Sequence, residues 1–547
     1  MKKFLFAACL AASVIVQSDN SFLMEKDLWI LSGDSITSTD TYRQILQTAI
    51  NHYHPDSNIS IGNRGVWGQK LSEEKTLEEK AQIISIMIAM NSFIHHEFGD
   101  QVDFSRIIDD HIKLLRERIR EYKKNGTHVI LMTPTLTDER EGGFFVTYNT
   151  RRGLVEVGKA IESLAKEEGC FVLPVAEELE EYMKRMGPYE CFRPDGVHPY
   201  GYGQYVIANT FLRHLNFAGN LNQGRNLTAP KKIEPLDFKC MTRFLNSPEE
   251  KIKFASNGIK GRIRWSVWCD SPRVVKENDL AGHCMARGEG RLNGEREWTL
   301  PVCGDAISLK IGERARILID IIPDCDKKSR LFCVDLANTV VFKMKDGKVS
   351  GEVTTTKKRS EGPQVATWEV REDGPDLWFT GKVKADSWNY KPYGSWGNVF
   401  KMNGLQVLFD FRPKERFAGV NTDRDAPMVL FSIVDNPEFS FMPFVWMARR
   451  YQASLFSYAK KCDGGYDWTL GFRGNITDCE AFDIRKLDYF GFYLIVADEE
   501  GKDIVRYTQM PYLPHDNPER RMNQMMIIDR KGVFPNKTTT TVNFFAF

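Results

Sequence analysis

The segment from residue 26 to about 216 constrains the fold most, because short apolar runs alternate there with segments of helical period. The runs read LWIL, NISI, IISIMIAM, HVILMT and FVLPV. Between them, residues 105–126 carry an apolar stripe with Ser105 as the expected N-cap, and a second stripe covers residues 154–164. Strands that alternate with helices predict an α/β fold, a parallel sheet with helices on both faces.

The length of 547 residues indicates two to four domains, at roughly 150 residues each. Beyond the segment NFAGNLNQGRNLTAPKK the helical stripes largely vanish, and short alternating runs separated by turn residues take their place. A second boundary is expected at TTTKKRSEGPQ. We therefore predict an α/β domain at 22–218, a small β-sandwich at 230–355 and a second β-sandwich at 356–547, which holds six of the 11 tryptophans.

The first residues, MKKFLFAACLAASVIVQSDN, have the pattern of a secretory signal peptide over residues 1–18, with Val16 and Ser18 at the cleavage positions. The protein is therefore expected to be exported, to the periplasm or the extracellular space. Cys9, inside the apolar stretch, leaves a lipid anchor as an alternative. No membrane span is expected, because no stretch reaches roughly 20 apolar residues without charges.

The charges nearly cancel, with 74 Lys and Arg against 73 Asp and Glu, and no basic block stands out. Nucleic acid is therefore excluded as an expected partner. Ten of the 11 cysteines follow the signal segment, and they include no C-x-x-C pair and no Cys/His cluster at zinc spacing. The sequence thus predicts neither a metal nor a cofactor, and it leaves the disulfide pairing open.

The stretch LSGDSITSTD places Ser35 directly after the apolar run LWIL. Catalytic groups in open α/β sheets gather outside the carboxyl ends of strands, so Ser35 is either a nucleophile or a helix cap. Near the end of the same region, CFRPDGVHPYGYGQ contains Asp195 and His198. A carboxylate can fix the tautomer of an imidazole that faces a serine, although a surface turn also explains this pair.

Four short blocks, GDSIT, NRGVWGQ, IAMNS and DGVH, occur in the order and approximate spacing of the four blocks of the SGNH hydrolases, also called GDSL esterases/lipases. The resemblance covers about residues 26–216 and implies a three-layer, flavodoxin-like fold. It implies Ser35 as nucleophile, His198 as general base and then acid, and Asp195 as the carboxylate that orients His198.

The same resemblance implies an oxyanion hole formed by the backbone N–H groups of Ser35 and Gly68 and by the side-chain amide of Asn91. The third block departs from the usual Gly-x-Asn-Asp, since it reads AMNS and has Ala89 and Ser92 in place of the glycine and the aspartate.

Three further features near these blocks have alternative interpretations. Trp67 is either a wall of the pocket or a packed core residue. His95, His96 and Glu97 either line the pocket or bind a metal, or they form a polar loop. The glycine-rich YGYGQ lacks the lysine of a phosphate loop and is expected to begin the last helix.

The segment DSWNYKPYGSWGN in the last region offers a candidate sugar-stacking platform or, alternatively, core packing. Its aromatic residues are Trp388, Tyr390, Tyr393 and Trp396. The segments GLQVLFDFRP and DYFGFYLIVADEEGKD resemble the strand pairs of family 9 carbohydrate-binding modules and the related DOMON sandwiches.

Together these features predict a secreted serine esterase that removes an acyl group, most plausibly acetyl, from a carbohydrate. One alternative is a lipase or phospholipase acting on another ester. The other is a carbohydrate-binding surface protein whose hydrolase domain is inert.

Overall fold

The structure is a computed structural model, and the expected signal peptide lies outside the residues it describes. The described residues are 20–74, 80–94, 103–138, 148–186, 191–192, 196–199, 202–221, 225, 227, 251–270, 284–301, 314–325, 330–337, 341–354, 364–384, 404–410, 428–433, 441–446, 455–473, 487–500, 503–508, 526–532 and 539–543. Among them, none of the helices combines the length and apolarity needed to cross a bilayer.

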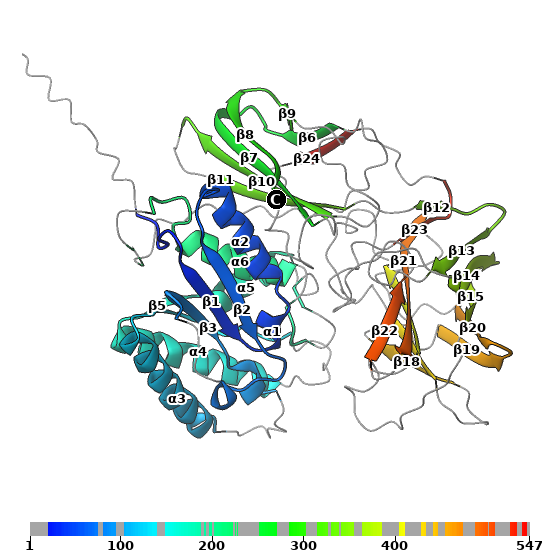
Figure 1. The fold of residues 1–547 in the computed structure, drawn as a ribbon, viewed down its shortest axis with the longest axis horizontal. Coiled ribbons are helices and arrows are strands. Elements are labelled where there is room, and N and C mark those ends of the chain that lie inside the picture. Colours follow the sequence, from blue (N-terminus) through cyan, green and yellow to red (C-terminus); the bar gives the residue numbers. More distant parts are fainter. Residues whose placement is uncertain are drawn as a thin grey trace, which may run out of the picture.

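The N-terminal region is built on a five-stranded parallel sheet of order β2-β1-β3-β4-β5 (Figure 1). Each of the five apolar runs forms a strand, and the strands are β1 (Leu28–Gly33), β2 (Ser60–Gly65), β3 (Ile83–Met87), β4 (His128–Met132) and β5 (Phe171–Leu173). This strand order is flavodoxin-like. The chain leaves the neighbouring strands β1 and β3 in opposite directions, and open α/β sheets bind ligands outside the carboxyl ends of the strands at such a point.

Helices cover both faces of this sheet (Figure 1). On one face α6 packs against α2 and α5, and on the other α3 packs against α4. The helices are α1 (Ser35–Ser38), α2 (Thr41–Tyr53), α3 (Ser105–Lys124), α4 (Tyr148–Glu168), α5 (Val175–Met186) and α6 (Tyr202–His214), and the short turns are η1 (Leu71–Glu73) and η2 (Met90–Ser92). As expected from YGYGQ, α6 begins within that segment.

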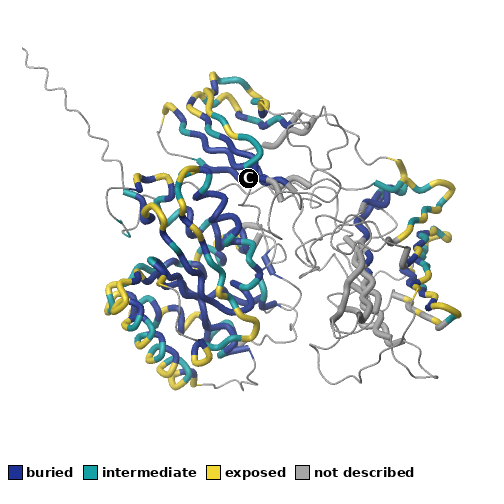
Figure 2. The backbone as a smooth tube through the Cα atoms, in the orientation of Figure 1, coloured by how far each residue is buried: buried dark blue, intermediate teal, exposed yellow. Residues whose placement is uncertain are grey.

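The two predicted apolar stripes lie on α3 and α4 and face the core, as Figure 2 shows for the buried inner sides of these helices. The expected N-cap of α3 is wrong, because Ser105 is the first helical residue. Its backbone N–H donates to the carboxylate of Asp103 at 2.8 Å. The expected end is confirmed, with Asn125 as C-cap and Gly126 at φ +79°.

The middle region contains a four-stranded sheet, β11-β10-β7-β8, and a three-stranded sheet, β24-β6-β9. Phe254, Val267 and Ile319 belong to the apolar core that the two sheets share. The strands are β6 (Lys251–Ala255), β7 (Lys260–Asp270), β8 (Cys284–Asn293), β9 (Glu297–Thr299), β10 (Arg314–Pro323), β11 (Arg330–Ala337) and β24 (Thr539–Asn543). The last strand of the chain therefore returns to this region, where it pairs with β6 in parallel.

The other face of the four-stranded sheet packs on the N-terminal region. Leu318, Leu331 and Cys333 are part of the apolar core around the parallel sheet. Nδ1 of His52, on α2, lies 2.7 Å from Oγ of Ser266, on β7. The N-terminal region therefore shares part of its core with the strands that follow it.

The last region contains a five-stranded sheet, β13-β14-β15-β20-β19, and a seven-stranded sheet, with β22 paired to β21. The sheets pack face to face through aromatic pairs such as Trp368 and Phe492, whose ring centroids are 5.3 Å apart. The strands are β12 (Val341–Lys343), β13 (Lys348–Thr354), β14 (Gln364–Asp373), β15 (Asp376–Lys384), β16 (Gly404–Asp410), β17 (Met428–Ile433), β18 (Phe441–Trp446), β19 (Leu455–Cys462), β20 (Gly465–Phe472), β21 (Tyr489–Glu500), β22 (Asp503–Thr508) and β23 (Met526–Asp529).

The boundary between the two strand-rich regions differs from the expected position near residue 355. Strand β12 pairs with β23 and strand β13 pairs with β14, so residues 341–354 belong with the last region. The two segments that resemble sugar-binding modules contribute β16 and β21, which pair antiparallel.

Candidate active site

Ser35 lies at the carboxyl edge of the parallel sheet, where the chain turns from β1 into α1. The side chain of Asp34 caps α1, because its carboxylate accepts the backbone N–H of Ile36 at 2.9 Å. A Cβ on Gly33 would lie 1.9 Å from Oγ1 of Thr37, so only glycine permits this tight turn. Since Asp34 provides the cap, the hydroxyl of Ser35 is left for another partner.

That partner is His198, which lies 163 residues further along the chain. Oγ of Ser35 and Nε2 of His198 are 2.8 Å apart. Ser35 is only 4% exposed, and His198 is half-buried. A serine hydroxyl on an imidazole nitrogen is the contact by which a base activates a nucleophile. The structure thus brings together the two residues that the GDSIT and DGVH blocks contribute.

The turn that carries His198 is held in place from two sides. The backbone N–H of Asp138 donates to the carbonyl oxygen of Gly196 at 2.8 Å. On the other side, the fully buried amide of Gln204, on α6, donates to the carbonyl oxygens of Pro199 at 3.1 Å and Ile36 at 3.2 Å. Gln204 therefore links the residue after His198 to the residue after Ser35. Sequence reasoning missed Gln204, because a glutamine near the start of a helix has no chemical signature of its own.

Asn91 and Gly68 lie in adjacent loops at the same edge of the sheet. Asn91, 4% exposed in η2 after β3, donates from Nδ2 to the carbonyl oxygen of Gln69 at 3.0 Å. Gly68 has φ +73°, and a Cβ there would meet no atom within 4 Å. Glycine is favoured at this position because L side chains rarely adopt this left-handed backbone conformation.

Trp67 lies on the surface beside this site. Its side chain is 53% exposed and that of the neighbouring Val66 is 52% exposed, which excludes the core-packing alternative. The ring centroids of Trp67 and His198 are 5.5 Å apart at an interplanar angle of 37°. An exposed apolar wall therefore borders the imidazole.

A buried carboxyl group lies directly beside Ser35. Burial raises the pKa of Asp34 to about 6, against the opposing effects of the Ile36 N–H and of the charge on His198. Two other histidines are buried elsewhere, and burial lowers the pKa of His52 to about 3 and that of His111 to about 4. Both histidines therefore stay neutral near neutral pH.

Sequence reasoning also missed the buried carboxyl group of Asp34. The sequence marks this residue only as a member of the GDSIT block, and its burial becomes visible only in the structure.

Several candidates fall outside the described residues. They are Asp195, the aromatic residues Trp388, Tyr390, Tyr393 and Trp396, and the group His95, His96 and Glu97. Within the described ranges, no cluster of His, Cys, Asp and Glu side chains is arranged to hold a metal ion.

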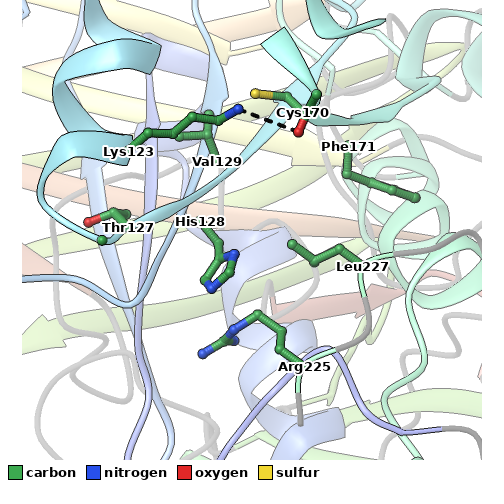
Figure 3. A pocket seen from close by; sticks show the side chains of 10 residues that line it. Lys123, Thr127, His128, Val129, Cys170, Phe171, Arg225 and Leu227 are labelled. Carbon is green, nitrogen blue, oxygen red and sulfur yellow. Dashed lines mark hydrogen bonds between the residues drawn. The ribbon is translucent and has the colours of Figure 1, made fainter.

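A cavity of about 530 Å³ lies beside the amino ends of β4 and β5, at the end of the sheet opposite Ser35. Figure 3 shows side chains that line it. Its charged groups have internal partners. Nζ of Lys123 donates to the carbonyl oxygens of Glu168 and Gly169, and the guanidinium of Arg225 donates to Asp27 at 2.8 and 3.0 Å. Burial raises the pKa of the Cys170 thiol, which keeps it a poor nucleophile near neutral pH. This cavity therefore contributes nothing to the site at Ser35.

No protein family and no curated protein matches the chain. Among solved structures, the acetylxylan esterase Axe2 from Geobacillus stearothermophilus is similar over 35% of this chain and 94% of its own, at 22% identity and a TM-score of 0.30. LAE5, an α/β hydrolase from the metagenome of Lake Arreo, is similar over 37% of this chain and 100% of its own, at 19% identity and a TM-score of 0.31. At these values the likeness says nothing about activity, which has to come from the site itself.

Proposed function

We propose that this chain is a serine esterase. Ser35 Oγ attacks the ester carbonyl while its proton passes to Nε2 of His198. The imidazolium then gives that proton to the leaving alcohol, and a water molecule, activated in the same way, releases the acid and restores the serine. The 2.8 Å contact between Ser35 and His198 at the sheet edge carries this proposal. In this proposed mechanism, Asp195 is the carboxylate that orients His198.

We assign the oxyanion hole to the backbone N–H groups of Ser35 and Gly68 and to the amide of Asn91. Two observations support this assignment. The bond from Asn91 to Gln69 fixes the amide and uses one of its two Nδ2 protons, so the other is available to an oxyanion. The space where Gly68 would carry a Cβ is empty, so a substrate can approach the backbone there. Fixed donors stabilise developing charge without having to reorganise.

For the substrate, we propose an acetyl ester of a carbohydrate. The indole ring of Trp67, which is 53% exposed, lies next to His198, the residue that must reach the leaving alcohol. An indole ring offers a flat apolar face to a ring-shaped alcohol such as a sugar. From the N-terminal segment alone, we further propose that the protein is exported to the periplasm or the extracellular space.

The test is acetate release from acetylated xylan and acetylated cellobiose, measured beside hydrolysis of p-nitrophenyl palmitate. We expect turnover of the acetylated sugars that Ser35→Ala abolishes and that Ser38→Ala, one turn along α1, retains. Faster turnover of the palmitate ester would favour the lipase alternative. Wild-type protein that releases no acetate and is not labelled at Ser35 by a fluorophosphonate would overturn the proposal in favour of an inert hydrolase domain.

A further inference from the structure

The five-stranded sheet of the last region has an outer face that does not pack on the seven-stranded sheet. Its inner face carries Trp368 and Phe379, which contact the opposing sheet. Because side chains alternate along a strand, every second residue points outward. The strand register places two outward rows side by side on β15, β20 and β19, namely Trp378, Gly471 and Phe456 in the first row and Thr380, Thr469 and Tyr458 in the second.

Two of the three aromatic side chains on this face are exposed. Phe456 is 47% exposed and Tyr458 is 53% exposed, whereas large apolar side chains are otherwise mostly buried in the described residues. The ring centroids of Trp378 and Phe456 are 5.9 Å apart, at an interplanar angle of 65°. Trp378 is half-buried beside Phe456. It forms one partly exposed aromatic surface with Phe456 and Tyr458, and we call these three side chains the outer aromatic row.

Gly471 explains how the indole reaches across the sheet. A Cβ on Gly471 would lie 2.6 Å from the ring of Trp378, so the indole occupies the space above the glycine. That space lies between Trp378 and Phe456 in the register. Without a side chain at 471, the apolar surface is continuous from β15 to β19.

The charged side chains around the outer aromatic row are of both signs. The next outward row consists of Lys382, Asp467 and Lys460, and β14 adds Glu369 and Arg371 on the same face. A polyanion such as a nucleic acid, or an anionic lipid surface, would be matched by charges of one sign. Mixed charges and the two threonine hydroxyls match instead a neutral ligand that is rich in hydroxyl groups.

We propose that this face binds a neutral polysaccharide. The apolar faces of successive sugar rings lie on Trp378, Phe456 and Tyr458, and their hydroxyl groups face Thr380 and Thr469. Phe456 and Tyr458 are two residues apart on one strand, or roughly 7 Å, so neighbouring rings of one chain can use both. The site involves none of the residues assigned to catalysis, so it does not depend on the proposed esterase activity.

The test uses the full chain carrying Ser35→Ala, which prevents turnover, and insoluble xylan and microcrystalline cellulose as probes. We expect this protein to sediment with at least one of the two polymers. The double variant Phe456→Ala/Tyr458→Ala should bind about tenfold more weakly or worse, because central aromatic contacts carry much of a binding energy. Lys460→Ala, on the same strand and face, is the matched control and should bind like the parent protein.

Both changed side chains are exposed, so circular dichroism and thermal unfolding should remain close to those of the parent. With Ser35 restored, the double variant should hydrolyse p-nitrophenyl acetate at the wild-type rate. Binding that survives the double change, or parent protein that sediments with neither polymer, would overturn the proposal. If gel filtration then shows a dimer that the double variant loses, the face is a contact between two copies of the chain.

Discussion

The side-chain amide of Asn91 is held in place by the carbonyl oxygen of Gln69, 3.0 Å from Nδ2. If the second Nδ2 proton of Asn91 points at the developing oxyanion, Asn91→Ala removes a hydrogen-bond donor that acts only in the transition state. We expect kcat to fall about 10²- to 10³-fold, with a much smaller change in KM. Steady-state kinetics with p-nitrophenyl acetate measure this. An unchanged kcat in a folded variant would remove Asn91 from the oxyanion hole.

Asp34 adds a pH dependence of stability at the residue scale. Burial raises its pKa from 3.8 to about 6, so the folded state binds this proton more tightly than the unfolded state does. The resulting stabilisation is fully present below pH 3.8 and is lost as the pH rises through 6. From the size of the shift it amounts to at most roughly 3 kcal/mol.

The variant Asp34→Asn keeps a capping side chain but cannot titrate. We expect the free energy of unfolding of the wild-type protein to fall, relative to that of the variant, as the pH is raised from 4 to 7. Urea unfolding of both proteins at several pH values gives this difference. Parallel pH profiles would mean that Asp34 does not titrate in this range.

At the scale of elements, Gln204 connects helix α6 to the two turns that carry Ser35 and His198. Its side-chain amide donates one hydrogen bond to each of these turns. Gln204→Leu removes both hydrogen bonds and replaces the amide with a side chain of similar size. We expect kcat to fall by an order of magnitude or more, since a misplacement of about 1 Å can cost 10²-fold. KM for a small ester should change little, because Gln204 contacts neither the acyl group nor the alcohol in this proposal.

Thr210→Val provides the control, because Thr210 is also buried on α6 but its hydroxyl donates only within the helix, to Val206. If both variants lose the same amount of stability and the same amount of activity, the effect of Gln204 is structural. A loss of kcat confined to Gln204→Leu identifies it as a positioning residue.

Elements with a strong local pattern could be predicted from the sequence. The five apolar runs are the five strands of the parallel sheet, and the stripes on α3 and α4 are buried. The pairing of β24 with β6 could not be predicted, because it joins segments almost 300 residues apart and depends on tertiary packing rather than on local preference. The same holds at the site. Ser35 and His198 follow from short blocks, whereas Gln204 is recognisable only by the two carbonyl groups that folding brings to it.

For the whole molecule, the sequence suggests that residues 22–218 fold as a separate domain, whereas the structure shows a shared core. Leu318 on β10 packs into the core of the N-terminal region, while its neighbour Ile317 faces the core of the middle region. The two residues lie on opposite faces of one strand and are both fully buried. Substituting each residue separately therefore tests the packing on one face of the sheet at a time.

We expect Leu318→Ala to lower the free energy of unfolding by about 2–5 kcal/mol, as for other buried leucines. The cavity that it leaves lies against the N-terminal region, so the amides of α2 should exchange hydrogen faster in this variant. Ile317→Ala, the matched control, should speed exchange in β6 and β7 and leave α2 unchanged. Exchange in α2 that stays at the wild-type rate in both variants would show that the N-terminal region does not depend on its contact with β10. If α2 responds only to Leu318→Ala, the strands after residue 250 are part of what keeps the Ser35 site folded.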